Sequence, residues 1–564
     1  MSKQTQPQNF ILKTAILKYR KVFFYAFIFS FTINLLTLAM SVYSLQIYDR
    51  VLSSSSIETL IMLSIIVGIA LIFSGFFSMV RNFVFSKISQ DLDNDLSKDL
   101  LSKSVTAASL ANNIQPTQML RDFSVVKNFI SGHTMHTLFD APWAILFIIG
   151  TFFVHYINGL VVLGAAIVLL FLAFCNEILL KKDSQKANEL SLKNLNYVET
   201  ISRNAEVIES MGMKRDLILH WDKLQKDTLA LENKVNEKSN FISSITKTIR
   251  LFIQMAMMGI GAYLVIQRQM SSGGIMATSI LSGKALAPFE TGIATWKSVL
   301  TFRKSYSRLE AFLENTVSFE TNTLLPEPKG AFSVEKVFFS PNQTAKPIIK
   351  GISFEIEQGE SIAIIGPSGA GKTTLAKLLV GIYKPTSGNV RLDGADIFRW
   401  DKTHLGKFVG YLPQDIELFK GHVKTNIARM QEEFDENEVL KAAQIVNAND
   451  MILRLPNGYE TEVGVGGNHL SSGQSQLIGL ARAFYGNPKI VILDEPNSHL
   501  DNFGEQCFLN TIGYAKQNNI TTIIIAHRTS ILSIVDKILI LQDGMVKLFD
   551  TREKVITQLQ GNSR

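Results

Sequence analysis

The first half of the chain alternates long uncharged segments with long charged ones. Residues 22–45 and 59–80 contain no Asp, Glu, Lys or Arg, and each is long enough to cross a bilayer as a helix. Residues 141–176 are also uncharged, but they are too many for one crossing. Because residues 155–158, His-Tyr-Ile-Asn, offer a tight turn, we interpret this segment as a hairpin of two spans.

Two further segments complete a prediction of six spans. Residues 251–266 form a short fifth span, and residues 274–296 form a sixth that contains Lys284, Pro288 and Glu290. A charge within a span usually faces protein or water, although a long side chain can also reach the interface. Glu290 follows Lys284 by six residues, off the i+3 and i+4 positions of the same helix face. We therefore expect Lys284 to line a polar pathway and not to pair with Glu290.

The intervening segments predict helices in water. Residues 81–136 are polar with a helical pattern, and residues 177–250, rich in Lys and Glu, predict a coiled-coil-like helix pair. Residues 1–21 carry five basic residues and no acidic one. Excess Lys and Arg marks the cytoplasmic side of a membrane protein. With six spans, both termini and both long loops are therefore expected in the cytoplasm.

Composition agrees with membrane spans joined to a water-soluble part. Hydrophobic residues make up 46% of the chain and the mean hydropathy is +0.17, which is unusual for a purely soluble enzyme. The net charge of +7 could indicate nucleic acid binding, but in a membrane protein it more often reflects cytoplasmic loops, so we expect no nucleic acid partner. Two cysteines, Cys175 and Cys507, imply no disulfide framework.

The second half predicts a separate α/β domain. Residues 317–330 form a polar, proline-containing linker, beyond which strand-like runs alternate with helical ones. A chain of 564 residues is also too long for a single core. We therefore predict a six-helix transmembrane domain over residues 1–316, the linker 317–330, and an α/β nucleotide-binding domain over residues 331–564.

A glycine-rich loop between an apolar run and a helical pattern gives this domain its chemistry. The loop reads Gly366, Pro367, Ser368, Gly369, Ala370, Gly371, Lys372, Thr373 and Thr374. Strand, glycine turn and helix form a phosphate cradle, in which glycines let backbone N–H groups face phosphate oxygens. Lys372 would reach the β- and γ-phosphates and the Thr373 hydroxyl would bind Mg²⁺, so ATP and Mg²⁺ are the expected cofactors. The alternative is a glycine turn with an incidental Lys-Thr pair.

Four downstream segments argue against that alternative. They are Tyr411-Leu-Pro-Gln414, Leu470-Ser-Ser-Gly473-Gln474, Ile490-Val-Ile-Leu-Asp494-Glu495 and Ile523-Ile-Ile-Ala-His527. Each alone has a structural explanation, since Asp-Glu often follows an apolar strand and a lone His at a strand end is usually structural. Together, at these spacings, they resemble the ATP-binding cassette (ABC) family from Phe332 to about Gln560. The resemblance implies an ABC exporter membrane domain fused to a P-loop ATP-binding cassette.

The resemblance implies a role for each polar residue. Asp494, with Thr373 and Gln414, would bind Mg²⁺, and Gln414 would also sense the γ-phosphate. Glu495 would act as the base for the attacking water, and His527 would hold the γ-phosphate. The implied mechanism is positioning and charge neutralisation around an in-line attack.

A second set of residues implies a dimer. Ser471, Gly473 and Gln474 resemble the family's signature motif, which contacts the γ-phosphate bound to the opposite subunit. Asp501, in Asn497-Ser-His-Leu-Asp501, matches the loop that couples the two sites. Because one chain carries both halves of an ATP site, the resemblance favours a homodimer with two equivalent sites.

Three positions depart from the family pattern. Pro341 stands where many cassettes have a tyrosine that stacks on adenine, which leaves Phe339 as a candidate for that contact. Val465 stands where exporters often have a glutamate. Ser472 occupies a signature position where glycine is commoner, and its small side chain should be tolerated.

A narrower resemblance extends over most of the chain. Its segments are Leu45 to Leu60, Asp140-Ala-Pro-Trp143, Arg203 to Met213, Thr278 to Pro288, Trp400-Asp401, Gly410 to Phe419 and Glu495-Pro-Asn-Ser498. They look like the type I secretion permease/ATPases of the PrtD group.

Membership of this group would imply ATP-driven export of an unfolded polypeptide with an uncleaved C-terminal signal, such as a protease, lipase or RTX-like cargo. The implied location is the bacterial inner membrane, and the implied partners are a periplasmic adaptor (membrane fusion protein) and an outer-membrane channel protein. We expect no N-terminal peptidase-like domain, because few residues precede the first span.

Two alternatives stay open from the sequence. One is a flippase or exporter of a lipid or small amphiphile. The other is a nucleotide-gated channel or regulator with degenerate ATP sites, against which the intact Lys372, Glu495, Ser471 and His527 argue.

Overall fold

The structure of the chain is a computed structural model. It describes residues 11–109, 116–315, 325–341, 346–464, 470–498, 500, 502–526 and 529–561. The described chain forms two compact units, the first containing residues 11–108 and 116–315 and the second residues 325–561.

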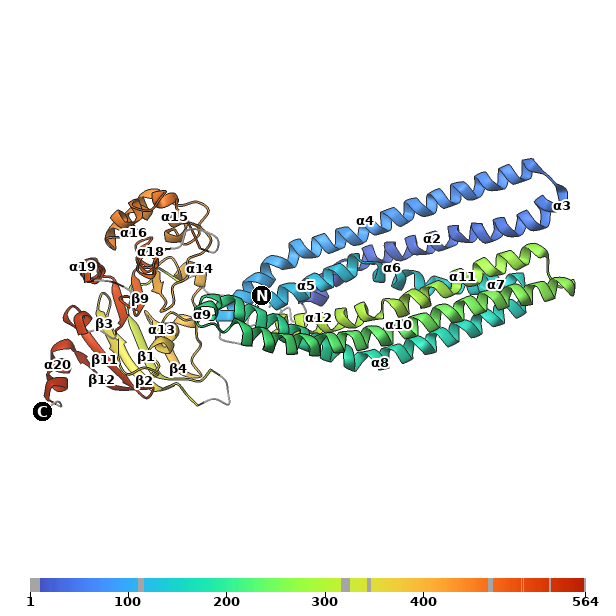
Figure 1. The fold of residues 1–564 in the computed structure, drawn as a ribbon. Coiled ribbons are helices and arrows are strands. Elements are labelled where there is room, and N and C mark those ends of the chain that lie inside the picture. Colours follow the sequence, from blue (N-terminus) through green and yellow to red (C-terminus); the bar gives the residue numbers. More distant parts are fainter. Residues whose placement is uncertain are drawn as a thin grey trace, which may run out of the picture. The chain divides into compact units, whose positions relative to one another are not determined.

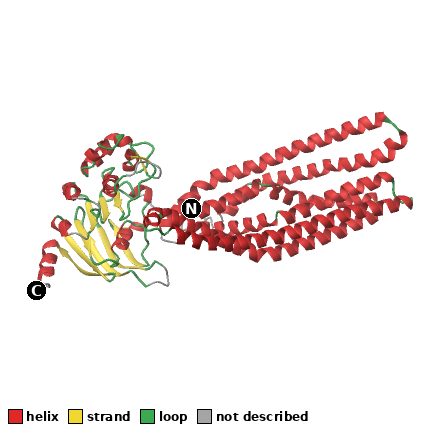
Figure 2. Cartoon of the chain, in the orientation of Figure 1, coloured by secondary structure: helices red, strands yellow, loops and turns green. Residues whose placement is uncertain are grey.

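The first unit is built from helices (Figures 1 and 2). They are α1 Ile11–Lys18, α2 Arg20–Gln46, the π-helix η1 Ile47–Val51, α3 Leu52–Ser54, α4 Ile57–Ser109, α5 Pro116–Ser131, α6 His133–Asp140, the 3₁₀ helix η2 Ala141–Trp143, α7 Ala144–Val154, α8 Tyr156–Arg203, α9 Ala205–Ser210, α10 Lys214–Ile266, α11 Ser272–Ala294 and α12 Trp296–Asn315. Among the described residues of this unit there is no strand.

Five helical segments of the described chain are long and apolar enough to cross a membrane: 20–54, 57–109, 133–154, 156–203 and 214–266. The predicted hairpin is confirmed and is tighter than expected, because His155 alone separates α7 from α8. α11, the sixth predicted span, is a helix of 23 residues but is not among the five. Its two charges and internal proline account for its weaker apolar character.

Three helices continue without a break between apolar and charged sequence. α4 has 53 residues, α8 has 48 and α10 has 53. No Gly or Pro, the residue types that most often end helices, occurs in residues 81–109 or 177–203. α8 and α10 pack along each other, which confirms the predicted helix pair and shows that it extends from the spans themselves.

α11 is surrounded by other helices of the unit. It packs against α2, α7, α8 and α10, and its buried face is rich in Gly, Ala, Ser and Thr, which allow helices to approach closely. Lys284 lies on its exposed side. Glu290 forms an ion pair with Arg250 of α10, with 2.9 Å between Oε2 and Nε. Glu290 therefore has a partner other than Lys284, as expected.

A buried ion pair joins α2, α4 and α6. Arg81 of α4 is 5% exposed, and its Nη1 donates to Oδ1 of Asp140 at 2.5 Å and to Oγ of Ser30 at 2.6 Å. Asn34 of α2 donates to the same Asp140 oxygen at 3.2 Å. Asp140 begins the Asp-Ala-Pro-Trp segment, so the structure gives that segment a role in holding the helices together.

The second unit combines sheets with helices on their faces (Figure 2). Its strands are β1 Phe332–Phe339, β2 Ile349–Ile356, β3 Ser361–Ile365, β4 Ser387–Leu392, β5 Ala395–Asp396, β6 Val409–Leu412, β7 Gly421–His422, β8 Glu462–Val463, β9 Ile490–Asp494, β10 Thr521–Ile525, β11 Lys537–Gln542 and β12 Met545–Thr551. Its α-helices are α13 Lys372–Leu379, α14 Lys402–Leu405, α15 Val423–Ile427, α16 Glu436–Ile445, α17 Asn449–Leu453, α18 Ser472–Phe484, α19 Asn502–Gln517 and α20 Arg552–Gly561, and its 3₁₀ helices are η3 Ile397–Arg399, η4 Gly458–Glu460 and η5 Thr529–Ser533.

The largest sheet is buried on both faces. Its strand order is β12-β11-β3-β10-β9-β6, in which all neighbours are parallel except β12 and β11. In β9, Ile490 and Ile492 pack into one hydrophobic cluster, and Val491 and Leu493 pack into another. Burial on both faces explains the unbroken apolar run of this strand. The predicted α/β fold is therefore confirmed.

We expect Arg81→Met to destabilise the first unit, because it leaves the Asp140 carboxylate inside the protein without its counter-ion. The cost should be about 2–3 kcal/mol, below the range for a fully buried pair, because the Asp140 side chain is 27% exposed. Thermal unfolding of the detergent-purified protein should show a lower midpoint, partly restored in Arg81→Met/Asp140→Asn. Lys87→Met, which removes an exposed pair with Asp91, is the control, and equal midpoints for the two Met variants would contradict this prediction.

Candidate functional site

Several predicted site residues follow neighbouring parallel strands. β3 pairs with β10, β10 with β9, and β9 with β6. The carboxyl ends of these strands lie at one edge of the sheet, which is where α/β proteins bind ligands. The loop that begins at Gly366 follows β3, Asp494 ends β9, and Gln414 lies two residues after β6. The structure therefore brings these three segments to one edge.

Two glycines of the loop are required by the geometry of the chain itself. A Cβ atom at Gly366 would lie 2.1 Å from the carbonyl oxygen of Leu541 in the neighbouring strand β11. Gly371 has a φ of 101°, a left-handed conformation that favours glycine. It is the N-cap of α13, so the unpaired N–H groups of the first helical turn begin at the loop. Such N–H groups form a ready site for phosphate.

Lys372 is the first residue of α13 and is held against the loop. It is 6% exposed, and its Nζ donates to the carbonyl oxygens of Gly366 at 2.8 Å and Pro367 at 3.1 Å. Burial lowers the pKa of Lys372, while the neighbouring carboxylates Glu495 and Asp494 act in the opposite direction. The ammonium group therefore lies beside the phosphate cradle and close to the two acids.

Asp494 is a buried carboxylate that lacks a well-formed hydrogen bond within the described part of the chain. It is 1% exposed, and both of its oxygens are buried. Burial raises the pKa of Asp494, and the nearby Thr373 hydroxyl acts against that shift. Oxygen atoms of carboxylate and hydroxyl groups are the ligands that Mg²⁺ prefers. Asp494 and Thr373 therefore fit a Mg²⁺ site, and Gln414 is exposed at the same edge of the sheet.

Glu495 has an uncommon backbone conformation. Its φ is 51°, in the left-handed region that few non-glycine residues adopt. Its N–H donates to the carbonyl oxygen of Ile525 at 3.1 Å, and its own carbonyl oxygen accepts from Nε2 of Gln476 at 3.3 Å. These two hydrogen bonds stabilise the left-handed conformation of Glu495 and fix the position of its Cα atom. The Glu495 side chain is half-buried. Backbone strain of this kind is concentrated at functional sites.

The signature residues form the start of α18. Ser471 Oγ accepts from the backbone N–H of Gln474 at 3.2 Å, and the Gln474 side chain accepts from the Ser471 N–H at 2.9 Å. This reciprocal pair is a capping box. Ser471 and Ser472 are exposed and Gly473 is half-buried. The same residues line a hollow shared with α16, α17 and the start of α19.

Two residues near the site were not predicted from the sequence. Gln476, 1% exposed, supports the backbone of Glu495 as described above. The buried Tyr411 hydroxyl has no hydrogen-bond partner in the described chain. Burial and the charge of Asp494 both raise the pKa of Tyr411, so the tyrosine stays neutral beside that acid. The only sequence signal for Tyr411 was its place three residues before Gln414.

The structure does not favour Phe339 as a platform for adenine. Phe339 is 9% exposed and belongs to a hydrophobic cluster of the second unit. Its ring stacks on that of Tyr383, with centroids 4.9 Å apart and 7° between the planes. The ring is therefore part of the core. Three predicted positions, Val465, Asp501 and His527, lie outside the described residues.

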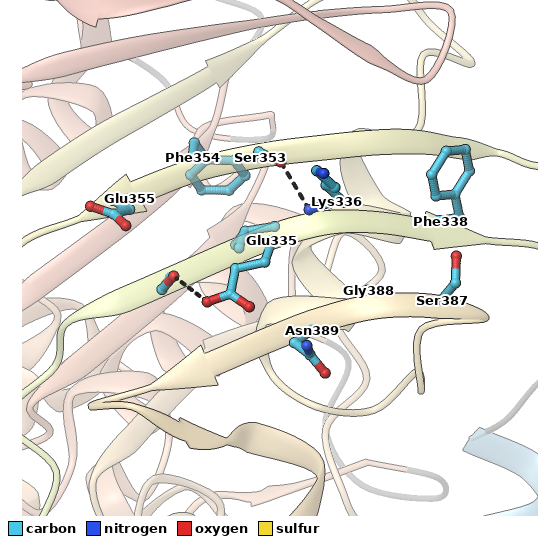
Figure 3. Close-up of a pocket in the computed structure, with 11 residues that line it drawn as sticks. Glu335, Lys336, Phe338, Ser353, Phe354, Glu355, Ser387, Gly388 and Asn389 are labelled. Carbon is cyan, nitrogen blue, oxygen red and sulfur yellow. Dashed lines mark hydrogen bonds between the residues drawn. The ribbon is translucent and has the colours of Figure 1, made fainter.

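A second hollow lies elsewhere, on the four-stranded sheet. Figure 3 shows its lining from β1, β2 and β4, including Glu335, Lys336, Phe338 and Asn389. None of the predicted site residues lines this hollow. It is therefore formed by residues other than those of the phosphate loop.

Comparisons with known proteins agree with the two-unit organisation. A family model described as ABC transporter transmembrane region matches residues 23–286, and one described as ABC transporter matches residues 349–498. A solved structure of a bacterial Atm1-family ABC exporter with ATP bound has a TM-score of 0.83 over 96% of each chain. That chain is 23% identical, so the likeness concerns the fold alone.

Relatives match both units together. The type I secretion system ATP-binding protein PrsD of Rhizobium meliloti is 36% identical over 93% of this chain and 91% of its own length. The leukotoxin translocation ATP-binding protein LktB of Mannheimia haemolytica is 29% identical over 94% of this chain and 76% of its own. The fold, the site and these matches define an ATP-hydrolysing membrane transporter of the ABC exporter type. Within that class, the chain belongs to the type I secretion ATP-binding proteins.

We expect Glu495→Gln to abolish ATP turnover while leaving nucleotide binding intact. The amide keeps the shape of the side chain but cannot accept a proton from water, and loss of a positioned base typically costs about a hundredfold or more. Steady-state ATPase and nucleotide-binding assays on the purified protein measure the two effects. Glu433→Gln, which changes an exposed acid outside the site, is the matched control. Hydrolysis by Glu495→Gln at the control rate would remove Glu495 from the role of base.

Proposed function

We propose that this chain uses ATP to export an unfolded polypeptide across the bacterial inner membrane as part of a type I secretion system. The observation that carries the proposal is that relatives named for type I secretion and for toxin translocation match both units of the chain. We propose a cargo with an uncleaved C-terminal signal. The proposed partners are a periplasmic adaptor and an outer-membrane channel.

The proposed chemistry divides the work among the residues at the sheet edge. Lys372 and the backbone N–H groups of the loop from Gly366 to Thr374, except Pro367, which has none, bind phosphate. Glu495 orients the water and takes its proton. Mg²⁺, when bound, supplies charge neutralisation at the phosphates. Asp494 and Thr373, with Gln414, hold it. We assign His527 to the γ-phosphate from its place after β10.

We further propose a homodimer in which each ATP is completed by the partner. In this arrangement Ser471, Gly473 and Gln474 contact the γ-phosphate held by the other chain, and Asp501 couples the two sites. The exposed position of Ser471 supports this, because an exposed residue is accessible to a second chain. Both termini and the charged helical extensions would lie in the cytoplasm, since residues 1–21 are basic.

We propose that Lys284 lies on the path of the cargo. It is an exposed charge on a helix that is otherwise enclosed by other helices. An unfolded chain carries unsatisfied amide groups, which a path through the membrane must keep in contact with water or polar groups. A flippase could use the same charge for a phosphate headgroup. The nature of the cargo therefore decides between the two functions.

The direct test is to compare proteins released into the medium by cells that carry the wild-type chain, Glu495→Gln or Lys284→Glu. We expect the wild-type chain to release at least one polypeptide with its C-terminus intact, and Glu495→Gln to release none. Lys284→Glu should reduce release while its ATPase rate stays within a few-fold of wild type, since Lys284 is far in sequence from the cassette. Equal release in all three strains, together with lipid movement in proteoliposomes, would support the flippase instead.

A mixing experiment tests the shared ATP site. Lys372→Ala disables the phosphate loop of one chain, and Ser471→Arg blocks the signature helix of another. If the two act in trans, a mixed dimer retains one site free of both changes, so purified mixed dimers should trap nucleotide at up to half the wild-type level. Each variant expressed alone should trap none. Absence of trapping in purified mixed dimers would mean that both residues serve the same site in cis.

A further inference from the structure

The side chain of Asp49 joins the turn between α2 and α4 to the turn before α11. Its partner in the second turn, Ser271, lies 222 residues further along the chain. It lies in η1, the π-helix between α2 and α3. Its Oδ2 accepts from the Ser271 hydroxyl at 2.5 Å, and its Oδ1 accepts from the backbone N–H of Gly273 at 2.8 Å. Ser271 is itself the N-cap of α11 and accepts from the Gly274 N–H at 3.3 Å. Asp49 therefore completes the N-terminal cap of α11 from another part of the chain.

The contact is both electrostatic and steric. The N-terminus of a helix carries a partial positive charge, so a carboxylate is favoured there. A Cβ atom at Gly273 would lie 2.4 Å from the carbonyl oxygen of Leu45 and 2.8 Å from Oδ1 of Asp49. The start of α11 thus touches the end of α2 directly, with no room for a side chain. Short π-helical segments such as η1 often occur at functional positions.

This cap attaches α2 to another helix at one end of the spans. Another polar attachment of the same spans is the Arg81–Asp140 pair, which lies where α4 leaves its uncharged segment. Asp49 lies at the opposite end of the same spans, in the turn between α2 and α4. Figure 1 marks this turn by the label of the neighbouring α3. The two attachments are therefore separated by the length of a membrane span.

We propose that Asp49 is a positioning residue that latches α2 to α11 on the extracytoplasmic side, and that this latch must release when the path opens outward. The proposal rests on the proposed export function, because it needs that turn to lie outside the cytoplasm. Ser271 and Ser272 are exposed and Asp49 is half-buried. Water can therefore replace the broken hydrogen bonds, which makes the latch reversible. The latch positions α11, the helix that carries Lys284.

The test measures the distance between the two turns directly. Spin labels are placed on cysteines introduced at the exposed Ile57 and Gln269, in a chain with Cys175→Ser and Cys507→Ser. Pulsed electron–electron double resonance on the full chain in nanodiscs gives the distribution of distances between the two spin labels. Without nucleotide we expect a short distance to predominate over a minor longer one, and with ATP in the Glu495→Gln background we expect the longer one to predominate. Asp49→Ala should raise the long-distance population several-fold without nucleotide.

Matched variants separate a latch from a general structural role. Arg50→Ala changes the exposed neighbour of Asp49 and should leave the distribution unchanged. Asp49→Asn can still accept from Gly273, so it should give an intermediate shift. If Asp49→Ala does not assemble, Ser271→Ala, which removes one hydroxyl, carries the comparison. A wild-type distribution in Asp49→Asn and Ser271→Ala, or no change on ATP trapping, would overturn the proposal.

The experiment also distinguishes this proposal from the proposed function. No cargo is present, so the distances do not depend on what is exported. If the wild-type chain releases no polypeptide but the turns separate as expected, the latch stands and the cargo assignment fails. If polypeptide is released and the distances do not respond to Asp49, the cargo assignment stands and the latch fails.

Discussion

The requirement that buried backbone groups be hydrogen-bonded shapes both units. In the apolar spans only a helix satisfies it, because lipid offers no partners, and α4, α8 and α10 continue as helices well beyond their uncharged residues. In the second unit, a parallel sheet covered on both faces satisfies it in a different way. The phosphate loop and the acidic pair Asp494-Glu495 lie where regular strand pairing stops. Gly366 and Glu495 both lie where a strand ends.

Helix starts impose the same requirement, since the first N–H groups of a helix lack internal partners. α18 meets it locally, through Ser471 and Gln474, whereas α11 also uses Asp49 from a distant turn. The two solutions differ in what they leave available. The Ser471 hydroxyl uses its acceptor capacity in the capping box, so its hydrogen remains able to donate to a phosphate oxygen. A cap that a ligand can join without breaking it suits a residue proposed to contact ATP.

The sequence predicted most of the fold because its signals are local. Uncharged runs mark spans wherever they lie, and strand-loop-helix order identifies the phosphate loop without tertiary information. The capping box was also readable, as Ser-x-x-Gln before an apolar stretch. Phe339 shows the limit, because an aromatic residue at a strand end gives no sign of whether its ring faces a ligand or the core. The Asp49 contact shows this limit more strongly, because its partner Ser271 lies 222 residues away and no local pattern indicates the pairing.

The sequence of α11 also gave no information about its tertiary contacts. Its sequence, with Lys284, Pro288 and Glu290, is that of a poor span, yet the helix packs against α2, α6, α7, α8 and α10. Tertiary contacts make up for its weak apolar character: its small residues pack closely, Glu290 pairs with Arg250, and Asp49 caps its start. A helix that is held by contacts with other helices can move when those contacts change. A helix that contacts only lipid cannot be moved in this way. This dependence on tertiary contacts is the reason why we place the proposed change of state at α11, the predicted span that is not among the five long apolar helices.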